Sequence, residues 1–269
     1  MLIDAIGQQH PRAGADARIV SLVPSITELL FELGLAGQVV GRTGFCIHPR
    51  AALREVPKLG GTKDVDLEGV RELAPTHVIV NIDENTRETY AALCSFVPHV
   101  IVTHPNAPDD NLELYTLLGG IFSCAARATE LAQAYRVARR RVDEAAQALP
   151  ARRVLYLIWR DPWMSVGPDT YIARTLALVG WHTVATAAAD RYPSFSASEL
   201  GTLAPDLCLL SSEPYPFRAK HVAEVERLCG ARGRVYLIDG EMLSWYGSRA
   251  IAGLDYLART AHTLLEEAA

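Results

Sequence analysis

The sequence has no hydrophobic run long enough to span a membrane and no block of charge of one sign. No stretch reaches the roughly 18–20 apolar residues that a transmembrane helix requires. Charged residues make up 21% of the chain, the formal net charge is −5, and the arginine triplet at 139–141 lies among alanines and acids. Proteins that bind nucleic acid more often show a basic patch interleaved with aromatics. We therefore expect neither a transmembrane helix nor a nucleic-acid partner.

A signal peptide and a disulfide framework are missing as well. The first 20 residues show no basic start followed by an apolar run of about 7–15 residues, which favours a cytoplasmic compartment. The five cysteines are odd in number and widely scattered, and this pattern implies no disulfide framework. Three of them, Cys94, Cys124 and Cys208, stand in apolar surroundings, so we expect small buried hydrophobes there.

Motifs for common catalytic chemistry are absent. The chain contains no GxSxG elbow, no glycine-rich Walker loop and no GxGxxG after a strand. We therefore expect a binding protein and not an enzyme. The enzymatic alternative is an α/β tetrapyrrole-processing enzyme such as a metal chelatase, with His48 as metal ligand and Glu241 as base.

What the sequence does contain is an alternation of strands and helices after residues 1–17, which are polar and are expected to form a loose leader. At the start of the first helix, Ser25 and Glu28 have the spacing of a capping box. The expected strands are 18–23, 39–41, 77–82 and 99–104, and two further expected helices are 65–75 and 86–96. Such alternation predicts a parallel sheet with helices on its faces.

A helical segment then divides two similar halves. Between 109 and 150 there is no strand signal, and after a break at Gly119–Gly120 an apolar helical stripe continues to Pro150. Beyond it three earlier patterns return: 153–158 matches 18–23, 199–210 matches 69–80, and 233–239 matches 98–104. We predict two α/β lobes, 18–108 and 151–269, joined by the helical linker 109–150. The alternative is one continuous doubly wound domain.

Two lobes predict a ligand cleft between them, because ligands favour domain interfaces and the carboxyl ends of parallel strands. In the first lobe the loop GRTGFCIHP offers Phe45, Cys46 and His48. Aromatics on loops suit stacking against a large planar ligand. The second-lobe loops hold Trp159, Trp163, Tyr192, Trp245 and Tyr246.

Cys46 and His48 combine two ligand types that soft and borderline metals prefer. Three interpretations remain open. The pair binds a bare ion together with further donors such as His104, Glu241 or His77. Alternatively, one of the two side chains takes an axial position on the metal of a macrocycle, or the loop is purely structural.

Several motifs carry a family resemblance. The stretches ARIVSLVPSITELLFELG, VVGRTGFCIHP and GGTKDVDLEGVRELAPTHVIV, with SSEPYPFR and DGEMLSWYG later in the chain, resemble the class III periplasmic binding proteins for vitamin B12 and ferric siderophores. The likeness covers most of 17–260 and is closest to the cobalamin-binding members, the helical-backbone metal receptors. It implies two Rossmann-like α/β lobes joined by a single long backbone helix, with the ligand in the cleft between them.

The resemblance also implies a function. The chain would be a monomeric periplasmic protein that delivers cobalamin or a related corrinoid to the BtuC-like permease of an ABC importer. A ferric siderophore and haem are alternative ligands, and a cytoplasmic corrinoid chaperone is an alternative role. In this family a glutamate on each lobe docks onto the permease, and here Glu84 and Glu213 stand nine and eight residues after Pro75 and Pro205.

Overall fold

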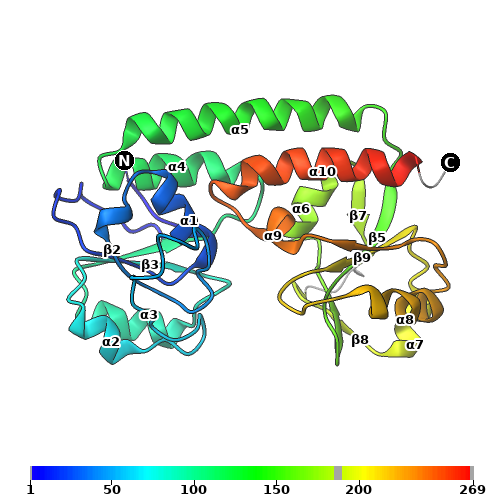
Figure 1. Ribbon diagram of the computed structural model, residues 1–269, viewed down its shortest axis with the longest axis horizontal. Helices are drawn as coiled ribbons and strands as arrows, with labels where there is room; N and C mark the ends of the chain where they lie inside the picture. Colours follow the sequence, from blue (N-terminus) through cyan, green and yellow to red (C-terminus); the bar gives the residue numbers. More distant parts are fainter. Residues whose placement is uncertain (1, 185–189, 267–269) are drawn as a thin grey trace. The chain divides into compact units, whose positions relative to one another are not determined.

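The computed structural model describes residues 2–184 and 190–266 (Figure 1). The contacts of the chain fall into two units. The first comprises Met1–Pro105, Asp109–Tyr135 and Tyr246–Arg249, and the second comprises Asn106–Pro108, Arg136–Trp245 and Ala250–Ala269. Each unit has its own sheet with helices on both faces, which confirms the α/β class and the two lobes. One continuous doubly wound domain is therefore not supported.

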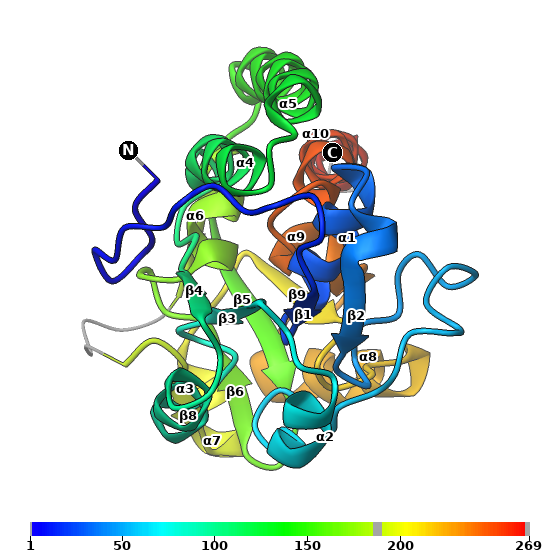
Figure 2. The ribbon, with the colours of Figure 1, turned by 90° about the vertical axis from the view of Figure 1, so that its left-hand side faces the viewer.

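The sheet of the first unit has the strand order β2-β1-β3-β4, and every pairing in it is parallel. Its strands are β1 (Ile19–Ser21), β2 (Val39–Arg42), β3 (His77–Asn81) and β4 (His99–Thr103). The helices are α1 (Pro24–Glu32), α2 (Leu67–Glu72), α3 (Arg87–Cys94) and α4 (Asp110–Ile121). Figure 2 shows α2 and α3 on one face of this sheet and α1 and α4 on the other. Strand residues such as Val20, Val78 and Val100 form an apolar core together with residues of α2 and α3.

The second unit repeats this order as β7-β5-β9-β10, again all parallel. Its strands are β5 (Arg152–Trp159), β6 (Trp163–Ser165), β7 (Trp181–Thr183), β8 (Ser194–Phe195), β9 (Leu207–Ser211) and β10 (Val235–Ile238). Antiparallel β6 and β8 extend the sheet beside the second half of β5. The helices are α6 (Tyr171–Ala177), α7 (Ala197–Thr202), α8 (Ala219–Cys229), α9 (Gly240–Ser244) and α10 (Arg249–Glu266). In Figure 1, α7 and α8 cover one face, and α6 and α10 cover the other.

The shared strand order explains the internal repeat of the sequence. Strands β1, β3 and β4 occupy the same places in the first sheet as β5, β9 and β10 in the second. Each of these pairs contains or adjoins one of the three matched sequence patterns. The repeat therefore reflects two copies of one supersecondary plan.

Helix α5 (Ala125–Ala146) is 22 residues long and carries the chain from the first unit to the second. The predicted long helix is present, but the predicted break at Gly119–Gly120 is wrong, because α4 continues to Ile121. A Cβ atom on Gly119 would lie 2.4 Å from the Cβ of Ala128 on α5. This glycine thus permits the close approach of two helices and does not interrupt one.

The N-terminal residues, expected to form a loose leader, are held against β4. The Nε2 of His10 lies 3.0 Å from the Oδ2 of Asp4, and both side chains are buried. The backbone N–H of Val102 donates to the same Asp4 oxygen at 3.1 Å, and the N–H of Ala5 donates to the Val102 carbonyl at 2.9 Å. These bonds satisfy backbone groups on the outer edge of β4, which would otherwise remain an open sheet edge.

Two local expectations fail for identifiable reasons. Val23, and not Ser25, is the N-cap of α1, because Pro24 occupies the first helical turn and no side chain caps the helix. Glu28 instead accepts two hydrogen bonds from Arg249, at 2.8 and 2.7 Å.

All five cysteines are free thiols. Cys208 is buried as expected, whereas Cys94 is exposed and Cys124 is half-buried, so the expectation was wrong for these two. Within the ranges that the structure covers, no helix combines the length and apolar character that a membrane crossing requires.

Candidate functional site

The loop that follows β2 exposes two large apolar side chains. Phe45 is 62% exposed and Ile47 is 39% exposed, while Cys46 between them has no exposed surface. This alternation sends every second side chain into the core and leaves the aromatic ring in water. Phe45 therefore stands where a ligand can reach it.

The Cys46 thiol is buried in the first unit and contacts two threonine hydroxyls. The hydroxyl of Thr27 donates to its Sγ at 3.0 Å, and the Oγ1 of Thr43 lies 3.2 Å from the same atom. Burial raises the pKa of the Cys46 thiol, opposed only in part by the Thr27 hydrogen bond. A neutral thiol held by two hydroxyls stabilises the loop, and this geometry keeps it away from a metal.

Two of the candidate metal donors, His104 and His77, have other neighbours within the first unit. His48 itself is half-buried. The Nε2 of His104 lies 3.5 Å from the Oδ2 of Asp83, and the ring of His77 stacks on His99 at 4.8 Å. Burial, with the nearby charge of His99, lowers the pKa of His77 to about 4. Among the described residues no group of three or more His, Cys, Asp or Glu side chains could hold an ion, so a bare-ion site at this loop is not supported.

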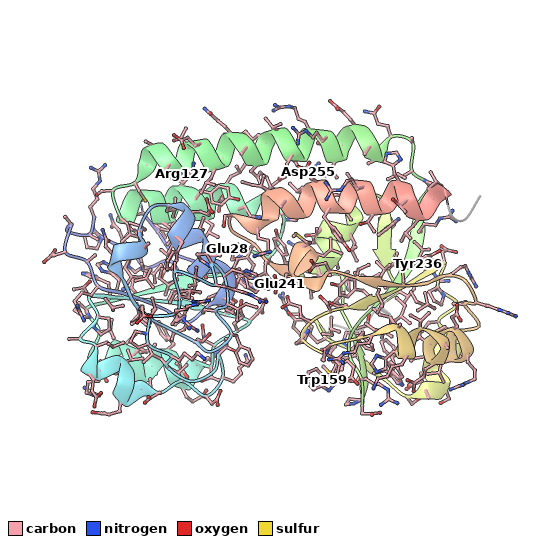
Figure 3. All side chains as sticks on the ribbon, viewed as in Figure 1. Glu28, Arg127, Trp159, Tyr236, Glu241 and Asp255 are labelled. Atoms are coloured by element: carbon pink, nitrogen blue, oxygen red, sulfur yellow. The ribbon has the colours of Figure 1, made fainter. Side chains whose placement is uncertain are left out.

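The aromatic residues near the end of β5 divide into a surface residue and a core residue. Trp159, labelled in Figure 3, is 40% exposed and meets the ring of Tyr215 edge-on at 5.6 Å. Trp163 is buried and stacks on Phe217, with centroids 6.3 Å apart. Trp163 thus packs in the second unit's core, whereas Trp159 is accessible, as is Tyr192 in part, since it is half-buried.

Trp245 and Tyr246 are nearly buried, and each holds a glutamate. The indole Nε1 of Trp245 donates to the Oε1 of Glu213 at 2.8 Å, and the hydroxyl of Ser244 donates to the same oxygen at 2.6 Å. The Tyr246 hydroxyl donates to the Oε1 of Glu84 at 2.6 Å. The hydrogen bonds of Trp245 and Tyr246 were not predicted from the sequence, because their glutamate partners lie 32 and 162 positions away.

Burial also shifts the pKa values of Glu213 and Tyr246. It raises the pKa of the Glu213 carboxyl, and the Ser244 hydrogen bond opposes that change. Burial, followed by the negative charge of Glu84, raises the pKa of Tyr246. The raised pKa of Tyr246 keeps its hydroxyl protonated, so that it donates to Glu84.

Glu84 and Glu213 occupy equivalent places in the two units. Glu84 lies three residues after the end of β3, and Glu213 lies two residues after the end of β9. These strands correspond in the shared sheet order, and each glutamate is half-buried. Each glutamate therefore follows the corresponding strand of its own unit, as the sequence spacing predicted.

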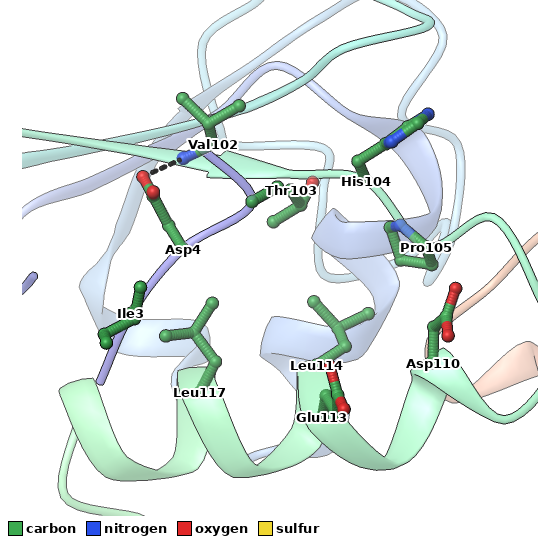
Figure 4. Close-up of a pocket in the computed structure, with 11 residues that line it drawn as sticks. Ile3, Asp4, Val102, Thr103, His104, Pro105, Asp110, Glu113, Leu114 and Leu117 are labelled. Carbon is green, nitrogen blue, oxygen red and sulfur yellow. Dashed lines mark hydrogen bonds between the residues drawn. The ribbon is translucent and has the colours of Figure 1, made fainter. Parts of the chain in front are cut away.

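A hollow of about 300 Å³ lies beside the loop after β4, in the first unit (Figure 4). Asp4 and Val102 line it on one side, and Leu114 and Leu117 of α4 line it on the other. The Asp4 carboxylate, which points toward Val102 in Figure 4, already accepts a hydrogen bond from the Val102 N–H and pairs with His10. We assign this hollow no ligand.

Comparison with known proteins gives a consistent result. A family model described as "Periplasmic binding protein" matches residues 19–241. A cobalamin-binding protein of Halobacterium salinarum is 28% identical over 201 residues, or 71% of this chain and 52% of that protein. The chain therefore spans about half the length of this curated relative.

Solved structures show the same fold. The vitamin B12 binding protein BtuF of Vibrio cholerae has a TM-score of 0.81 at 16% identity, covering 93% of this chain and 98% of that one. The haem-binding protein RhuT from Roseiflexus sp. RS-1 has a TM-score of 0.81 at 23% identity, covering 93% of this chain and 99% of that one. The repeated sheet plan, the connecting helix and the extent of the family match lead to one conclusion: the chain belongs to the periplasmic binding protein family.

Proposed function

We propose that the protein is a substrate-binding protein that takes up cobalamin or a related corrinoid and delivers it to the permease of an ABC importer. The family supplies the general role of ligand binding. The relative in Halobacterium salinarum supports the choice of a corrinoid, since it is a cobalamin-binding protein. The proposed action is non-catalytic, and the proposed compartment is the periplasmic or outer side of the membrane, where such proteins work.

The exposure of Phe45 and Trp159 is the observation that carries the proposal. Phe45 is 62% exposed after β2, and Trp159 is 40% exposed at the end of β5. Moving an aromatic ring out of water into a binding site is favourable, and the face of the ring suits a flat macrocycle. We propose Phe45, His48, Trp159 and Tyr192 as the ligand-binding set. Cys46, Trp163, Trp245 and Tyr246 are left out because core contacts occupy them.

Glu84 and Glu213 are the proposed contacts with the permease. Their equivalent positions suit a partner with two related halves, and arginine pairs readily with carboxylates in bidentate geometry. The hydrogen bonds from Tyr246 and Trp245 support the proposal, because they fix the orientation of each carboxylate before docking.

Titration calorimetry of the purified chain tests the ligand. The titrants are cyanocobalamin, cobinamide, haem and a ferric siderophore. We expect corrinoid binding, and we expect Phe45→Ala and Trp159→Ala to weaken it about 10- to 100-fold, as loss of a buried aromatic contact does. Val137→Ala is the matched control, since Val137 is also exposed, at 38%, but lies on α5.

His48→Ala tests the axial contact separately. If the imidazole reaches cobalt, the substitution changes the visible spectrum of the bound corrinoid more than its affinity. Failure of every tetrapyrrole to bind would contradict the proposal and favour a siderophore. Equal affinity of Phe45→Ala, Trp159→Ala and Val137→Ala would contradict the assigned residues.

A further inference from the structure

A second hollow in the first unit is lined by positive charge. It has a volume of about 390 Å³ and is formed entirely by residues between 42 and 58. No acidic side chain lines it. Its walls include the apolar side chains of Ile47 and Leu53 and four cations: Arg42, Arg50, Arg54 and Lys58.

Arg42 is the unusual member of this set because its guanidinium is buried. The residue is only 6% exposed. One terminal nitrogen donates to the Thr43 carbonyl at 3.1 Å, and the other donates to the Leu53 carbonyl at 3.0 Å. The Nε–H is buried and has no hydrogen-bond partner among the residues that the structure describes. No carboxylate among the described residues forms an ion pair with Arg42.

A buried cation without a counter-ion is unfavourable, since the lost hydration is repaid only by an opposite charge or a full set of hydrogen bonds. Three further cations around the same hollow add repulsion. Arg50, Arg54 and Lys58 are exposed, so water screens them, but Arg42 is not. An anion in the hollow would remove both unfavourable contributions.

A purely structural role for Arg42 explains only part of this arrangement. The two carbonyl bonds brace the loop, and the Arg42 backbone also bonds Pro57 and Leu59. This role accounts for neither the unpaired Nε–H nor the cations gathered beside it. Glu55 is the one acidic residue between 42 and 58, and it is exposed and absent from the lining.

We propose that this hollow, which is lined by Arg42, Arg50, Arg54 and Lys58, binds an oxyanion, namely a phosphate or a carboxylate group. The planar guanidinium offers parallel N–H donors that match the spacing of oxygens in both groups. The oxyanion is either a separate small anion or a group carried by the cargo. Only the second case rests on the proposed function.

Calorimetric titration with inorganic phosphate and pyrophosphate at low ionic strength tests the site. We expect saturable binding that weakens as salt is added. Arg50→Ala and Arg54→Ala should each weaken it about tenfold or more, because each removes a charge-assisted contact. Arg136→Ala removes the same charge from an exposed position on α5 and should leave binding unchanged. Arg42→Gln is a secondary variant, since loss of the loop brace could unfold the segment.

The outcomes separate the alternatives. Absence of phosphate and pyrophosphate binding in the native chain overturns the proposal, as does equal binding by the Arg50→Ala, Arg54→Ala double variant. If pyrophosphate weakens cyanocobalamin binding, the cargo supplies the oxyanion; if both bind independently, the anion is separate. Anion binding without corrinoid binding would refute the proposed function and leave this site intact.

Discussion

Replacing Tyr246 by phenylalanine removes one hydroxyl and little else. The ring is only 7% exposed, so its apolar contacts remain, while the 2.6 Å hydrogen bond to the Glu84 carboxylate is lost. The two interpretations of this residue predict different results. As a ligand-binding aromatic, Tyr246 would affect affinity. As a donor to Glu84, it would affect stability.

The structure sets the magnitude. A hydrogen bond to a charged group contributes about 1.5–3 kcal/mol, which is a factor of about 10 to 150 in the unfolding equilibrium. The upper half of that range applies when water does not replace the lost donor, and the burial of Tyr246 favours this case. We expect Tyr246→Phe to lower the free energy of unfolding by about 2.5 kcal/mol and to change corrinoid affinity less than twofold.

Urea unfolding followed by circular dichroism provides the measurement, and calorimetry provides the affinity. Tyr236→Phe is the control, because the Tyr236 hydroxyl donates a neutral, exposed hydrogen bond to the Gly233 carbonyl at 3.0 Å. That variant should lose about 0.5–1 kcal/mol or less. Equal losses for the two variants, or a large fall in affinity for Tyr246→Phe alone, would refute the assignment.

Three further substitutions test other parts of the structure. Burial raises the pKa of Glu213 above its ordinary value of 4.5, so this group contributes most stability below pH 4.5 and loses that contribution as pH rises through its folded pKa. The unfolding free energy of the native chain minus that of Glu213→Gln should therefore decrease as pH rises above 4.5. Gly119→Val should cost about 1–3 kcal/mol in urea unfolding, because its Cβ would meet Ala128. His10→Ala should cost about 1–3 kcal/mol and speed proteolysis of the N-terminal segment, since buried Asp4 loses a partner, and unchanged proteolysis would contradict this.

Much of the fold was predictable because it depends on patterns that repeat along the chain. Buried parallel strands produce apolar runs, and these located β1, β3, β4, β5, β9 and β10. The recurrence of those runs predicted that the sheets share one plan, which the strand orders confirm. Helix α5 was predictable because its stripe continues without a proline or glycine.

The errors concern contacts between residues far apart in the sequence. Gly119 was predicted to break a helix, since local propensity does not reveal that Ala128 lies against it. The polar N-terminal segment was predicted to be loose, because nothing local shows that Asp4 and His10 pair beside β4. Glu28 had capping-box spacing but pairs with Arg249, 221 positions away.

The tryptophans of the candidate site also show that sequence position does not reveal which side chains are buried. Loop position alone assigned Trp159, Trp163 and Trp245 to the ligand, yet Trp159 is exposed whereas Trp163 and Trp245 are buried. An indole that donates to a carboxylate has an apolar face and a polar edge to satisfy, and Glu213 satisfies the edge of Trp245. Tyr246, the next residue, donates its hydroxyl hydrogen bond to Glu84, so two consecutive aromatic residues bind the two glutamates. We therefore propose that the aromatic residues of this segment orient the two docking glutamates, and that the exposed rings bind the ligand.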